Sequence, residues 1–255
     1  HVRYFYKVFP ESLMPTPVKL PAEVKNLIHH ADGVKSFIVK PLKPCPNFKP
    51  GQFLHLAMDE YEPSFHWPES RVFSIANSPT RRDKLRITFS VKGKFTERMY
   101  SDVKTGDVLW LKLPYGSFSF PDIESEIVLI AGGTGITPFV SFLEYAIDKK
   151  TNTKISLYYG VKSPEYLIFD SLLNECKSAL KYFKCHIFFE TNVNRNTFDI
   201  ISKGMLSIQT ILYDTNVDGN AIYFISGPQQ MILSFMKKLM KAGILENKII
   251  IDAWE

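Results

Sequence analysis

The pattern of hydrophobic and polar positions along the chain changes near residue 122. Before that point, short runs of alternating or β-branched residues are separated by Gly, Pro, Asn and Asp, which is typical of antiparallel strands joined by turns. The runs predict strands at residues 23–28, 34–39, 53–58, 72–75, 85–91 and 108–113, with one short helix at 97–101. We therefore expect a small antiparallel β-barrel in this half.

Beyond residue 122, apolar runs alternate with amphipathic helical segments, which predicts parallel βαβ units. Strands are expected at residues 127–131, 155–161, 185–189, 221–225 and 249–251, and helices after Pro138, from 163 to about 180, and after Pro228. The predicted fold class is a β-barrel domain over residues 18–122 followed by an α/β parallel-sheet domain over residues 123–255.

Size and composition limit the possible functions without identifying one. The chain has 255 residues, 45% of them hydrophobic and 22% charged, so it can bury one large core or two ordinary ones. Its net charge of +5 comes without a long run of Lys and Arg. We therefore expect no nucleic-acid partner, whereas an acidic protein partner is compatible with the modest positive charge.

The cysteines argue against a metal or disulfide framework. Cys45, Cys176 and Cys185 are odd in number and lack the spacings of a zinc site or an iron–sulfur cluster, and the six histidines show no metal-ligand spacing. We therefore expect no metal and a cytoplasmic or other reducing compartment. The sequence shows no signal peptide and no apolar run of the ~18 residues that a membrane-spanning helix needs.

Residues 127–138 join a buried strand to a glycine-rich turn and a helix start. The turn contains three glycines, Gly132, Gly133 and Gly135. Glycine permits a positive φ and lets a pyrophosphate approach the backbone, because no Cβ stands in the way. Thr137 can cap the next helix and Pro138 fits its first turn, so that the helix directs free amides at an anion. The stretch departs from the G-x-G-x-x-G fingerprint at its third small residue, and a plain glycine-rich connection is the alternative.

Two stretches of the first half carry candidate chemistry. Arg71, Phe73 and Ser74 lie on one predicted strand and offer a cation for phosphate, an aromatic face for a flat heterocycle and a hydroxyl. Residues 93–96 open the short helix, where backbone amides, Lys94 and the Thr96 hydroxyl can hold phosphate. Taken singly, each stretch is explained at least as well by an ordinary strand, or by a hairpin turn and a capped helix.

The second half ends with another turn of the same kind. Strand 221–225 runs into Ser226, Gly227 and Pro228 just before a helix. Open α/β sheets bind their ligands at such carboxyl ends of strands, so we expect this turn to face a ligand.

Taken together and in order, five motifs resemble the ferredoxin–NADP reductase family over residues 18–255. The motifs are Arg71-x-Phe73-Ser74, Gly93-x-x-Thr96, Gly132-Gly-Thr-Gly-Ile-Thr-Pro138, Ser226-Gly-Pro228 with Met231, and a near-terminal Asp252-x-Trp254. The resemblance implies a flavin-binding barrel followed by a nicotinamide-dinucleotide-binding domain, with the flavin ring in the crevice between them.

The resemblance also implies a role for each matching residue. The flavin would be bound by Arg71, Val72, Phe73 and Ser74 and by Gly93, Lys94, Phe95 and Thr96. The dinucleotide would be bound by Gly133, Thr134, Gly135, Pro138, Gly227 and Pro228. The catalytic residues would be Ser74, Ser226, Asp252 and Trp254, with Trp254 covering the flavin. Three of these residues depart from the commonest family pattern: Phe73 replaces a tyrosine, Ser226 a cysteine, and Trp254 a smaller aromatic residue.

The function implied by the resemblance is transfer of a hydride from NAD(P)H to FAD, followed by electron transfer to a redox partner such as a ferredoxin, a haem protein or an oxygenase component. FAD is expected over FMN because residues 93–96 can hold a pyrophosphate. NADH is favoured over NADPH because the Glu190 carboxylate would repel a 2′-phosphate, although Arg195 argues the other way. A reductase of free flavin or small acceptors, and a non-catalytic nucleotide-binding subunit, are the alternatives.

Overall fold

The computed structural model describes residues 16–120, 126–191, 200–215 and 220–252. The expected domain boundary between residues 122 and 123 lies outside these ranges, as do Arg195 and Trp254. Within the described residues, no helix combines the length and the apolar character needed to cross a membrane.

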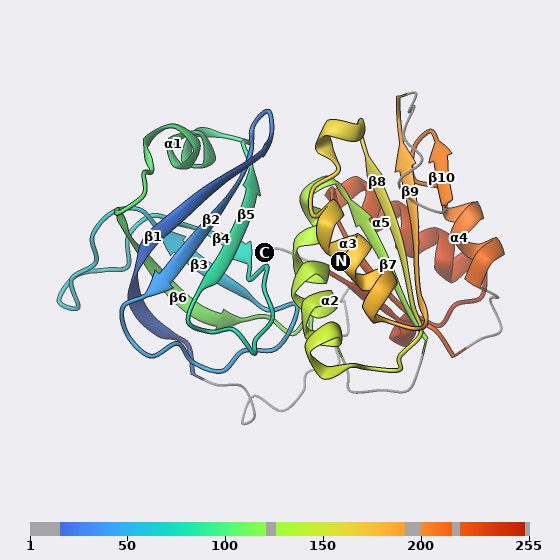
Figure 1. Ribbon diagram of the computed structural model, residues 1–255, viewed down its shortest axis with the longest axis horizontal. Helices are drawn as coiled ribbons and strands as arrows, with labels where there is room; N and C mark the ends of the chain where they lie inside the picture. Colours follow the sequence, from blue (N-terminus) through green and yellow to red (C-terminus); the bar gives the residue numbers. More distant parts are fainter. Residues whose placement is uncertain (1–15, 121–125, 192–199, 216–219, 253–255) are drawn as a thin grey trace, which may run out of the picture.

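The first half is one antiparallel sheet that curves around a core (Figure 1). Its six strands lie in the order β4-β3-β6-β1-β2-β5. Their bounds are β1 Val18–Ala31, β2 Val34–Pro41, β3 Phe53–Ala57, β4 Ser70–Ser74, β5 Leu85–Ser90 and β6 Val108–Tyr115. Just beyond β4, the Ala76 N–H donates to the Arg86 carbonyl on the other edge strand at 2.9 Å. The two edges of the sheet therefore meet at this point, and the sheet forms a barrel.

Alternation along the barrel strands decides which side chains fill its core and which face outward. On β2, Phe37 and Val39 are fully buried in the barrel core, and β5 places Leu85 and Ile87 in the same cluster. Because successive residues of a strand point to opposite faces, Arg86 on β5 lies on the outer face. The outer face of β5 is the one that meets the second half of the molecule.

The second half is a parallel sheet of six strands in the order β10-β9-β8-β7-β11-β12. The strands are β7 Ile127–Gly132, β8 Ile155–Val161, β9 Phe183–Phe189, β10 Ile200–Lys203, β11 Ile222–Ser226 and β12 Ile249–Ile251. The chain builds outward from β7 to β10 and then returns to β11 on the other side of β7. This reversal makes the carboxyl ends of β7 and β11 the place where an open α/β sheet binds ligands.

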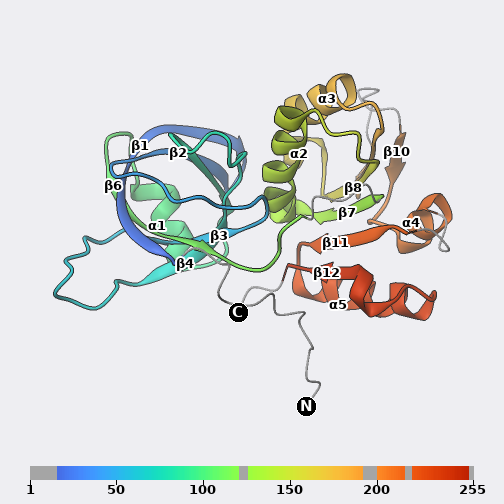
Figure 2. The same ribbon diagram turned by 90° about the horizontal axis from the view of Figure 1, so that it is seen from below.

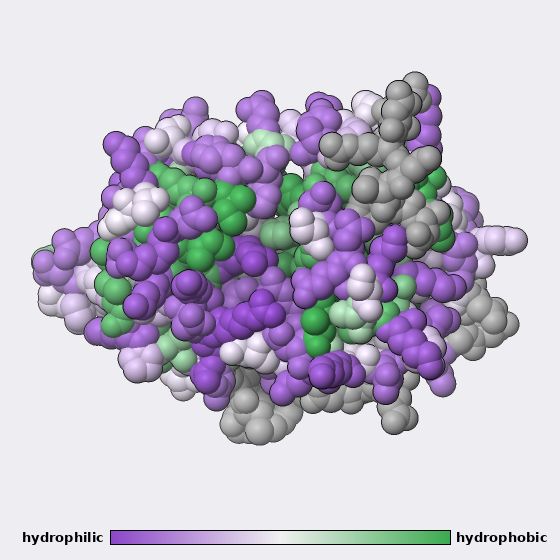
Figure 3. All heavy atoms as spheres, in the orientation of Figure 1, coloured by the Kyte–Doolittle hydropathy of each residue, from purple (hydrophilic) through white to green (hydrophobic). Residues whose placement is uncertain are grey.

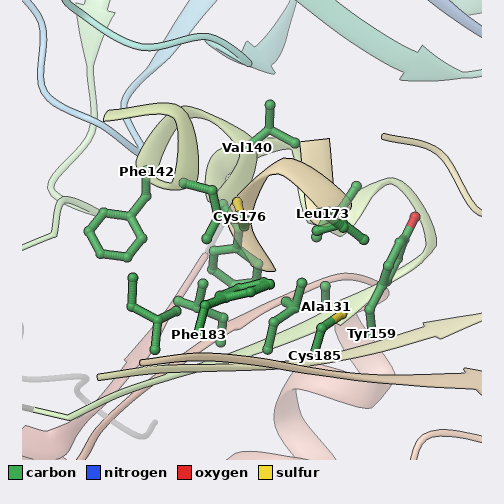
Figure 4. Close-up of a cluster of buried hydrophobic side chains, with 14 of the residues drawn as sticks. Ala131, Val140, Phe142, Tyr159, Leu173, Cys176, Phe183 and Cys185 are labelled. Carbon is green, nitrogen blue, oxygen red and sulfur yellow. The ribbon is translucent and has the colours of Figure 1, made fainter. Parts of the chain in front are cut away.

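Helices cover both faces of this sheet (Figure 2). They are α2 Thr137–Lys149 and α3 Asp170–Ala179 on one face, and α4 Ile208–Thr215 and α5 Gln229–Lys241 on the other. Leu129 and Ala131 of β7 pack in the cluster with α2 and α3, whereas Val128 and Ile130 pack with α4 and α5. Both faces of β7 are therefore buried, which explains its unbroken apolar run. Figure 4 shows the α2 and α3 side.

The two halves also share apolar contacts. Phe118 and Phe120, which follow β6, pack in the core cluster that contains α2. The Phe120 ring stacks on that of Phe142 with their centroids 4.0 Å apart. The barrel and the α/β half are therefore joined by buried surface as well as by the chain.

The sequence-based fold class is confirmed, with differences in individual elements. The helix expected from residue 163 is a short 3₁₀ turn, η3 Pro164–Tyr166, and α3 begins only at Asp170. Phe169 has a φ of 63°, a left-handed conformation that an α-helix cannot include, so the chain turns here before α3 starts. The short helix of the barrel, α1 Lys94–Asp102, begins three residues earlier than expected, and β10 and α4 were not expected.

Candidate functional site

A cleft of about 1040 Å³ opens between the two halves. Eight expected site residues of the barrel line it: Arg71, Val72, Phe73, Ser74, Gly93, Lys94, Phe95 and Thr96. Seven expected residues of the α/β half face them: Gly133, Thr134, Gly135, Ser226, Gly227, Pro228 and Asp252. Residues more than 180 positions apart in the sequence therefore meet in one cleft, at the carboxyl ends of β7 and β11.

Arg71 provides a cation at the edge of the cleft. Its Nη2 donates to the Glu69 carboxylate at 2.7 Å, and its guanidinium lies 4.9 Å from the centre of the Phe95 ring. Arg71 Nη1 also donates to the Ser70 carbonyl at 2.9 Å, so three neighbours orient the guanidinium. About half of the side chain is exposed, and its remaining N–H groups are open to an anion. Such a planar fork of donors matches a phosphate in two-point contact. Glu69, which also lines the cleft, was not anticipated from the sequence.

Phe73 and Ser74 lie deeper, where β4 ends. The Phe73 ring packs edge-on against Phe89, with their centroids 6.1 Å apart, at the rim of the barrel core. The Ser74 hydroxyl is almost fully buried and lies 3.3 Å from the Thr137 hydroxyl of α2. This contact joins the two walls directly at the floor of the cleft.

The start of α1 forms a second polar edge on the barrel wall. The Thr96 hydroxyl accepts the backbone N–H groups of Lys92 at 2.8 Å and Gly93 at 3.2 Å. The hydroxyl thus shapes the loop and is already engaged, so Lys92 and Lys94 supply the cations at this edge. Gly93 is extended, and no atom lies within 4 Å of the position that a Cβ would take, so a side chain there would project into open space.

The turn after β7, the 3₁₀ segment η2 Gly133–Ile136, forms the opposite wall. Gly133 has a φ of 53°, and its missing Cβ would meet nothing within 4 Å. Gly135 is needed for a different reason, because a Cβ there would lie 2.4 Å from the Ser226 carbonyl oxygen. The first turn is therefore open to a ligand at Gly133 and packed tightly against the second turn at Gly135.

The helix that follows does not begin as the sequence suggested. Thr137 is the first residue of α2, and its hydroxyl lies 3.0 Å from the Thr134 carbonyl instead of capping a backbone amide. Pro138 is buried in the first turn of α2 and is not among the residues that line the cleft.

Ser226 and Asp252 form a buried pair at the floor of the cleft. The Ser226 hydroxyl donates to Asp252 Oδ2 at 2.8 Å, and each residue is less than 5% exposed. The Asp252 backbone N–H donates to the Ile225 carbonyl at 2.9 Å, which fixes the segment after β12 beside the end of β11. Because the Ser226 proton is directed at the carboxylate, the Ser226 oxygen is left to accept a hydrogen bond from a ligand.

The remaining expected residues lie outside the cleft or outside the described residues. Glu190 is exposed just beyond β9, and its backbone N–H donates to the Val161 carbonyl at 3.2 Å. It does not line the cleft, although it lies at the same carboxyl edge of the sheet. Trp254 lies outside the described residues, so its expected contact with the flavin stays a prediction.

Several residues of the cleft were missed by sequence reasoning. They include Asp32 and Gly33 of the β1–β2 turn, Arg98 of α1, Thr88 and Ser90 of β5, and Tyr166 of η3. Tyr166 follows the carboxyl end of β8, so the rule that ligands lie at such ends could have indicated it. The β1–β2 turn reaches the cleft because β2 pairs with β5, and the hydrogen bond from the Val91 N–H to the Gly33 carbonyl continues that pairing to the turn.

The two walls have the chemistry of a site for two nucleotides. Cations and an aromatic ring lie on the barrel wall, and a glycine-rich turn at a helix start faces them. The cleft volume is at the upper end of the ~300–1,000 Å³ typical of small-molecule sites. Because both Gly93 and Gly133 leave open space where a Cβ would lie, phosphates can approach the backbone at either wall.

Comparisons with known proteins agree with this arrangement. Residues 129–237 match the family model of an oxidoreductase NAD-binding domain. The chain is 30% identical over 213 residues to the sulfhydrogenase 2 subunit gamma of Pyrococcus furiosus, which covers 79% of this chain and 70% of that protein. It is 27% identical over 234 residues to a flavohemoprotein of Rhizobium meliloti, covering 86% of this chain and 56% of the relative. The chain thus spans little more than half of that relative's length.

Solved structures share the fold at lower sequence identity. An Amycolatopsis cytochrome P450 reductase matches with a TM-score of 0.80 at 20% identity, over 92% of this chain and 69% of that one. A ferredoxin NADP⁺ reductase from Neisseria gonorrhoeae, with bound FAD and NADP, matches with a TM-score of 0.74 at 20% identity, over 92% and 98%. These likenesses establish the order of a barrel followed by an α/β sheet.

Proposed function

Because this chain belongs to the family of ferredoxin reductase-like FAD/NAD-binding oxidoreductases, we propose that it takes a hydride from NAD(P)H onto FAD and passes the electrons to a redox partner. The observation that carries the proposal is the single cleft with two unlike walls. A site for one nucleotide would not need both the Arg71–Ser74 strand and the turn at Gly133 in one opening.

On the barrel wall, the residues bind and orient. Arg71 and Lys94 bind phosphate, and the Gly93 backbone lets the phosphate come close. Phe73 lies against the flat ring, and the buried Ser74 hydroxyl fixes its reactive edge. Bound FAD supplies the redox chemistry, because it accepts a hydride and releases electrons singly.

On the α/β wall, η2 receives the phosphates of the dinucleotide and the Ser226 turn lies against its nicotinamide. The Ser226 oxygen accepts a hydrogen bond from the carboxamide, since its own proton is held by Asp252. The buried Asp252 carboxylate places a negative charge at the floor of the cleft, where it favours a cationic ring. The contribution of the protein to the rate is therefore mostly positioning, because hydride transfer needs reacting atoms about 3–3.5 Å apart.

The finer assignments follow from the same residues. FAD is preferred over FMN because the edge with Lys92 and Lys94 suits a pyrophosphate, and NADH over NADPH because Glu190 is an exposed carboxylate at the ligand edge of the sheet. We assign the flavin domain to residues 18–122 and the nicotinamide domain to residues 123–255. Pro138 would start the phosphate-binding helix, and Trp254 would cover the flavin.

The partner we propose is an electron-acceptor protein with an acidic surface, which complements the net charge of +5. Relatives include a propane 2-monooxygenase reductase component and a terephthalate 1,2-dioxygenase reductase component, and the names of both point to oxygenase systems. An iron–sulfur or haem acceptor in a reducing compartment is consistent with Cys45, Cys176 and Cys185, none of which forms a disulfide.

The decisive experiment is an anaerobic titration of the purified protein. We expect a yellow protein with a flavin spectrum that NADH bleaches, and that reoxidises when a ferredoxin or a cytochrome is added. Bleaching without reoxidation by either protein, but with reoxidation by free flavin, would favour the small-acceptor reductase. A colourless protein that binds no added FAD would contradict the proposal.

A further inference from the structure

A band of polar contacts joins the two halves away from the cleft. One side of α2 presents Ser141, Glu144 and Asp148 at spacings of three and four residues, so all three lie on one helical face. They contact the barrel segment 76–86. We call this set of contacts the polar joint. On the side of the molecule seen in Figure 3, the surface along the boundary between the halves is mainly hydrophilic.

Glu144 is the centre of the polar joint. Its Oε1 accepts a hydrogen bond from Arg86 Nη1 at 2.9 Å, and its Oε2 accepts the Ser78 backbone N–H at 3.0 Å. The residue is only 5% exposed, and a quarter of the Arg86 side chain is exposed. Without Arg86 the buried carboxylate would keep an uncompensated charge, and without the Ser78 N–H it would lose a hydrogen bond, so this geometry is strongly enforced.

The other contacts extend the joint in both directions. Ser141 Oγ donates to the Asn77 carbonyl at 2.8 Å, on the side toward the cleft. Asp148 accepts Arg81 Nη2 at 2.8 Å and the Thr80 hydroxyl, on the side toward the surface. Partial burial raises the pKa of Asp148, but hydrogen bonds from Thr80, Ser78 and Arg81 outweigh it and hold this pKa below its usual value. Because the Arg81 side chain is 57% exposed, the outer pair is screened by solvent and contributes less than the inner one.

The polar joint holds the same two elements that meet at the floor of the cleft. At the start of α2, the Thr137 hydroxyl lies 3.3 Å from that of Ser74 on β4. Seven residues further along α2, Glu144 binds Arg86, whose Nη1 also lies 3.3 Å from the carbonyl of Ala76, two residues past Ser74. The end of β4 and the helix α2 are therefore tied at two points.

Two points fix a direction, whereas one point permits rotation. At about 1.5 Å per residue, the two ties are roughly 10 Å apart along the helix. If the far tie slid by ~1 Å, α2 and the dinucleotide site at its start would turn by about 6°, which moves a ligand atom ~10 Å from the Thr137 pivot by ~1 Å. A shift of that order matters, because a misplacement of ~1 Å between reacting groups can cost about 100-fold in rate.

We propose that Glu144 and Arg86 are positioning residues that set the orientation of α2, and so of the dinucleotide site, relative to the flavin-binding strand β4. This inference rests on the proposed function for its kinetic consequence. The apolar contact of Phe120 with Phe142 holds the two halves together. The polar joint therefore contributes more to the angle between the halves than to the strength of their association.

The test is the double variant Glu144→Gln with Arg86→Met. The glutamine oxygen still accepts the Ser78 N–H, and no buried charge is left without a partner, so the protein should fold. The matched control makes the same changes in an ion pair within the α/β half, Glu126→Gln with Lys154→Met, where the pair distance is 2.8 Å. An Arg81→Ala variant probes the exposed outer pair.

We expect the joint variant to keep its flavin content and its KM for NADH within about twofold, while the rate constant of anaerobic reduction falls by about 10- to 100-fold. The long-wavelength absorbance given by stacked flavin and nicotinamide rings, measured on the reduced protein with NAD⁺, should weaken in parallel. The control should match the wild type in both, and Arg81→Ala should lose less than about threefold. A wild-type rate and absorbance in the joint variant would overturn the proposal, because a purely stabilising ion pair predicts that result.

A second measurement does not depend on turnover. Hydrogen exchange of the backbone amides at residues 133–149 should be faster in the joint variant than in the control. Unchanged exchange would overturn the positioning role even if neither NADH nor NADPH reduced the wild-type protein. Failure of the wild type to be reduced would instead count against the proposed function alone.

Discussion

The two walls of the cleft are built on opposite principles. The barrel wall presents side chains, namely the Arg71 guanidinium, the Phe73 ring and the Ser74 hydroxyl. The α/β wall presents mainly backbone, at Gly133 and at the turn after β11. The barrel wall can contact a ligand through its side chains, whereas the α/β wall can do so mainly through backbone that its glycines leave accessible.

The fold explains this difference. Antiparallel barrel strands alternate, so one strand such as β4 can pack its inner side chains and still offer others to a ligand. Parallel strands such as β7 are buried on both faces and open only where they end. The two walls should therefore respond oppositely to substitution: truncation should damage the barrel wall, and an added methyl group the α/β wall.

The largest effect should come from Gly135→Ala. The new Cβ would lie 2.4 Å from the Ser226 carbonyl, a backbone atom that can move only with its strand. We expect a loss of about 1–3 kcal/mol or more in the free energy of unfolding, together with much slower reduction by NADH. Urea denaturation and anaerobic stopped-flow reduction measure the two effects.

The control for this variant is Gly93→Ala on the barrel wall. Gly93 is extended and its Cβ position is open, so the unfolding free energy should fall by no more than about 1 kcal/mol, the cost of a poorer helix cap. Its flavin affinity should fall, because the methyl group occupies the approach of the phosphate. Equal destabilisation by the two variants would show that the two walls do not differ in how they respond to an added methyl group.

The sequence predicts a feature of this site well when neighbouring residues determine it, and poorly when residues far apart in the chain determine it. The turns at Gly133 and Ser226 are local signals, and the structure has both at strand ends. The reason for Gly135 was only partly foreseen, because its closest contact is the Ser226 carbonyl, 91 positions away in the chain. Such a packing requirement leaves no local pattern.

Other parts of the site were missed for the same reason. Ser78 and Glu144 of the polar joint are 66 residues apart, and no local sequence pattern around either residue indicates a contact with the other. The start of α3 was placed too early because Ser163 and Pro164 form a genuine helix-start signal, which the left-handed φ of Phe169 then interrupts. Glu69 lines the cleft because it accompanies Arg71, a pairing that the spacing permits and does not require.

The next largest effect should come from truncating the barrel wall with Arg71→Ala. Loss of a charged phosphate contact is worth about 1.5–3 kcal/mol, so flavin should bind roughly 10- to 150-fold more weakly, as measured by fluorescence titration of the FAD-depleted protein. Glu69→Gln should have the opposite effect. It removes a competing carboxylate 2.7 Å from the guanidinium, so flavin should bind more tightly. Full flavin content in purified Arg71→Ala protein would refute the assigned role.

Measuring the free energy of unfolding against pH should show which half of the molecule is more sensitive to acid. Burial lowers the pKa of His186 on β9, while the Asp214 carboxylate 3.7 Å from Nδ1 opposes this shift. The unfolded chain then binds more protons than the folded one below the ordinary pKa of 6.5, so stability should be lost as the pH falls from 6.5 through the folded-state pKa. His186→Gln should reduce the pH dependence of the unfolding free energy over that range, because it removes one of the titrating groups; His30 of the barrel, whose pKa burial also lowers, accounts for part of what remains.

The barrel supplies the comparison for this titration. Burial and the nearby Lys112 also lower the pKa of His55, which is only half-buried, so its contribution has the same sign. His55→Gln should therefore leave most of the acid sensitivity in place. If His55→Gln removed the pH dependence and His186→Gln did not, the acid-sensitive half would be the barrel.

The smallest expected effect concerns the side chain that the α/β half is proposed to use to tell NADH from NADPH. Glu190 lies beyond β9 at the same sheet edge as the glycine turn, where its carboxylate can accept ribose hydroxyls and repel a 2′-phosphate. Because Glu190 is exposed, solvent screens this repulsion, so Glu190→Ala should narrow the NADH to NADPH ratio of kcat/KM by about 10-fold or less. Glu175→Ala, an exposed carboxylate on α3, is the control for a general charge effect. An unchanged ratio in Glu190→Ala would mean that Glu190 does not discriminate between the two dinucleotides, and that this wall meets the ribose without a charged side chain, which would sharpen the contrast with the barrel wall.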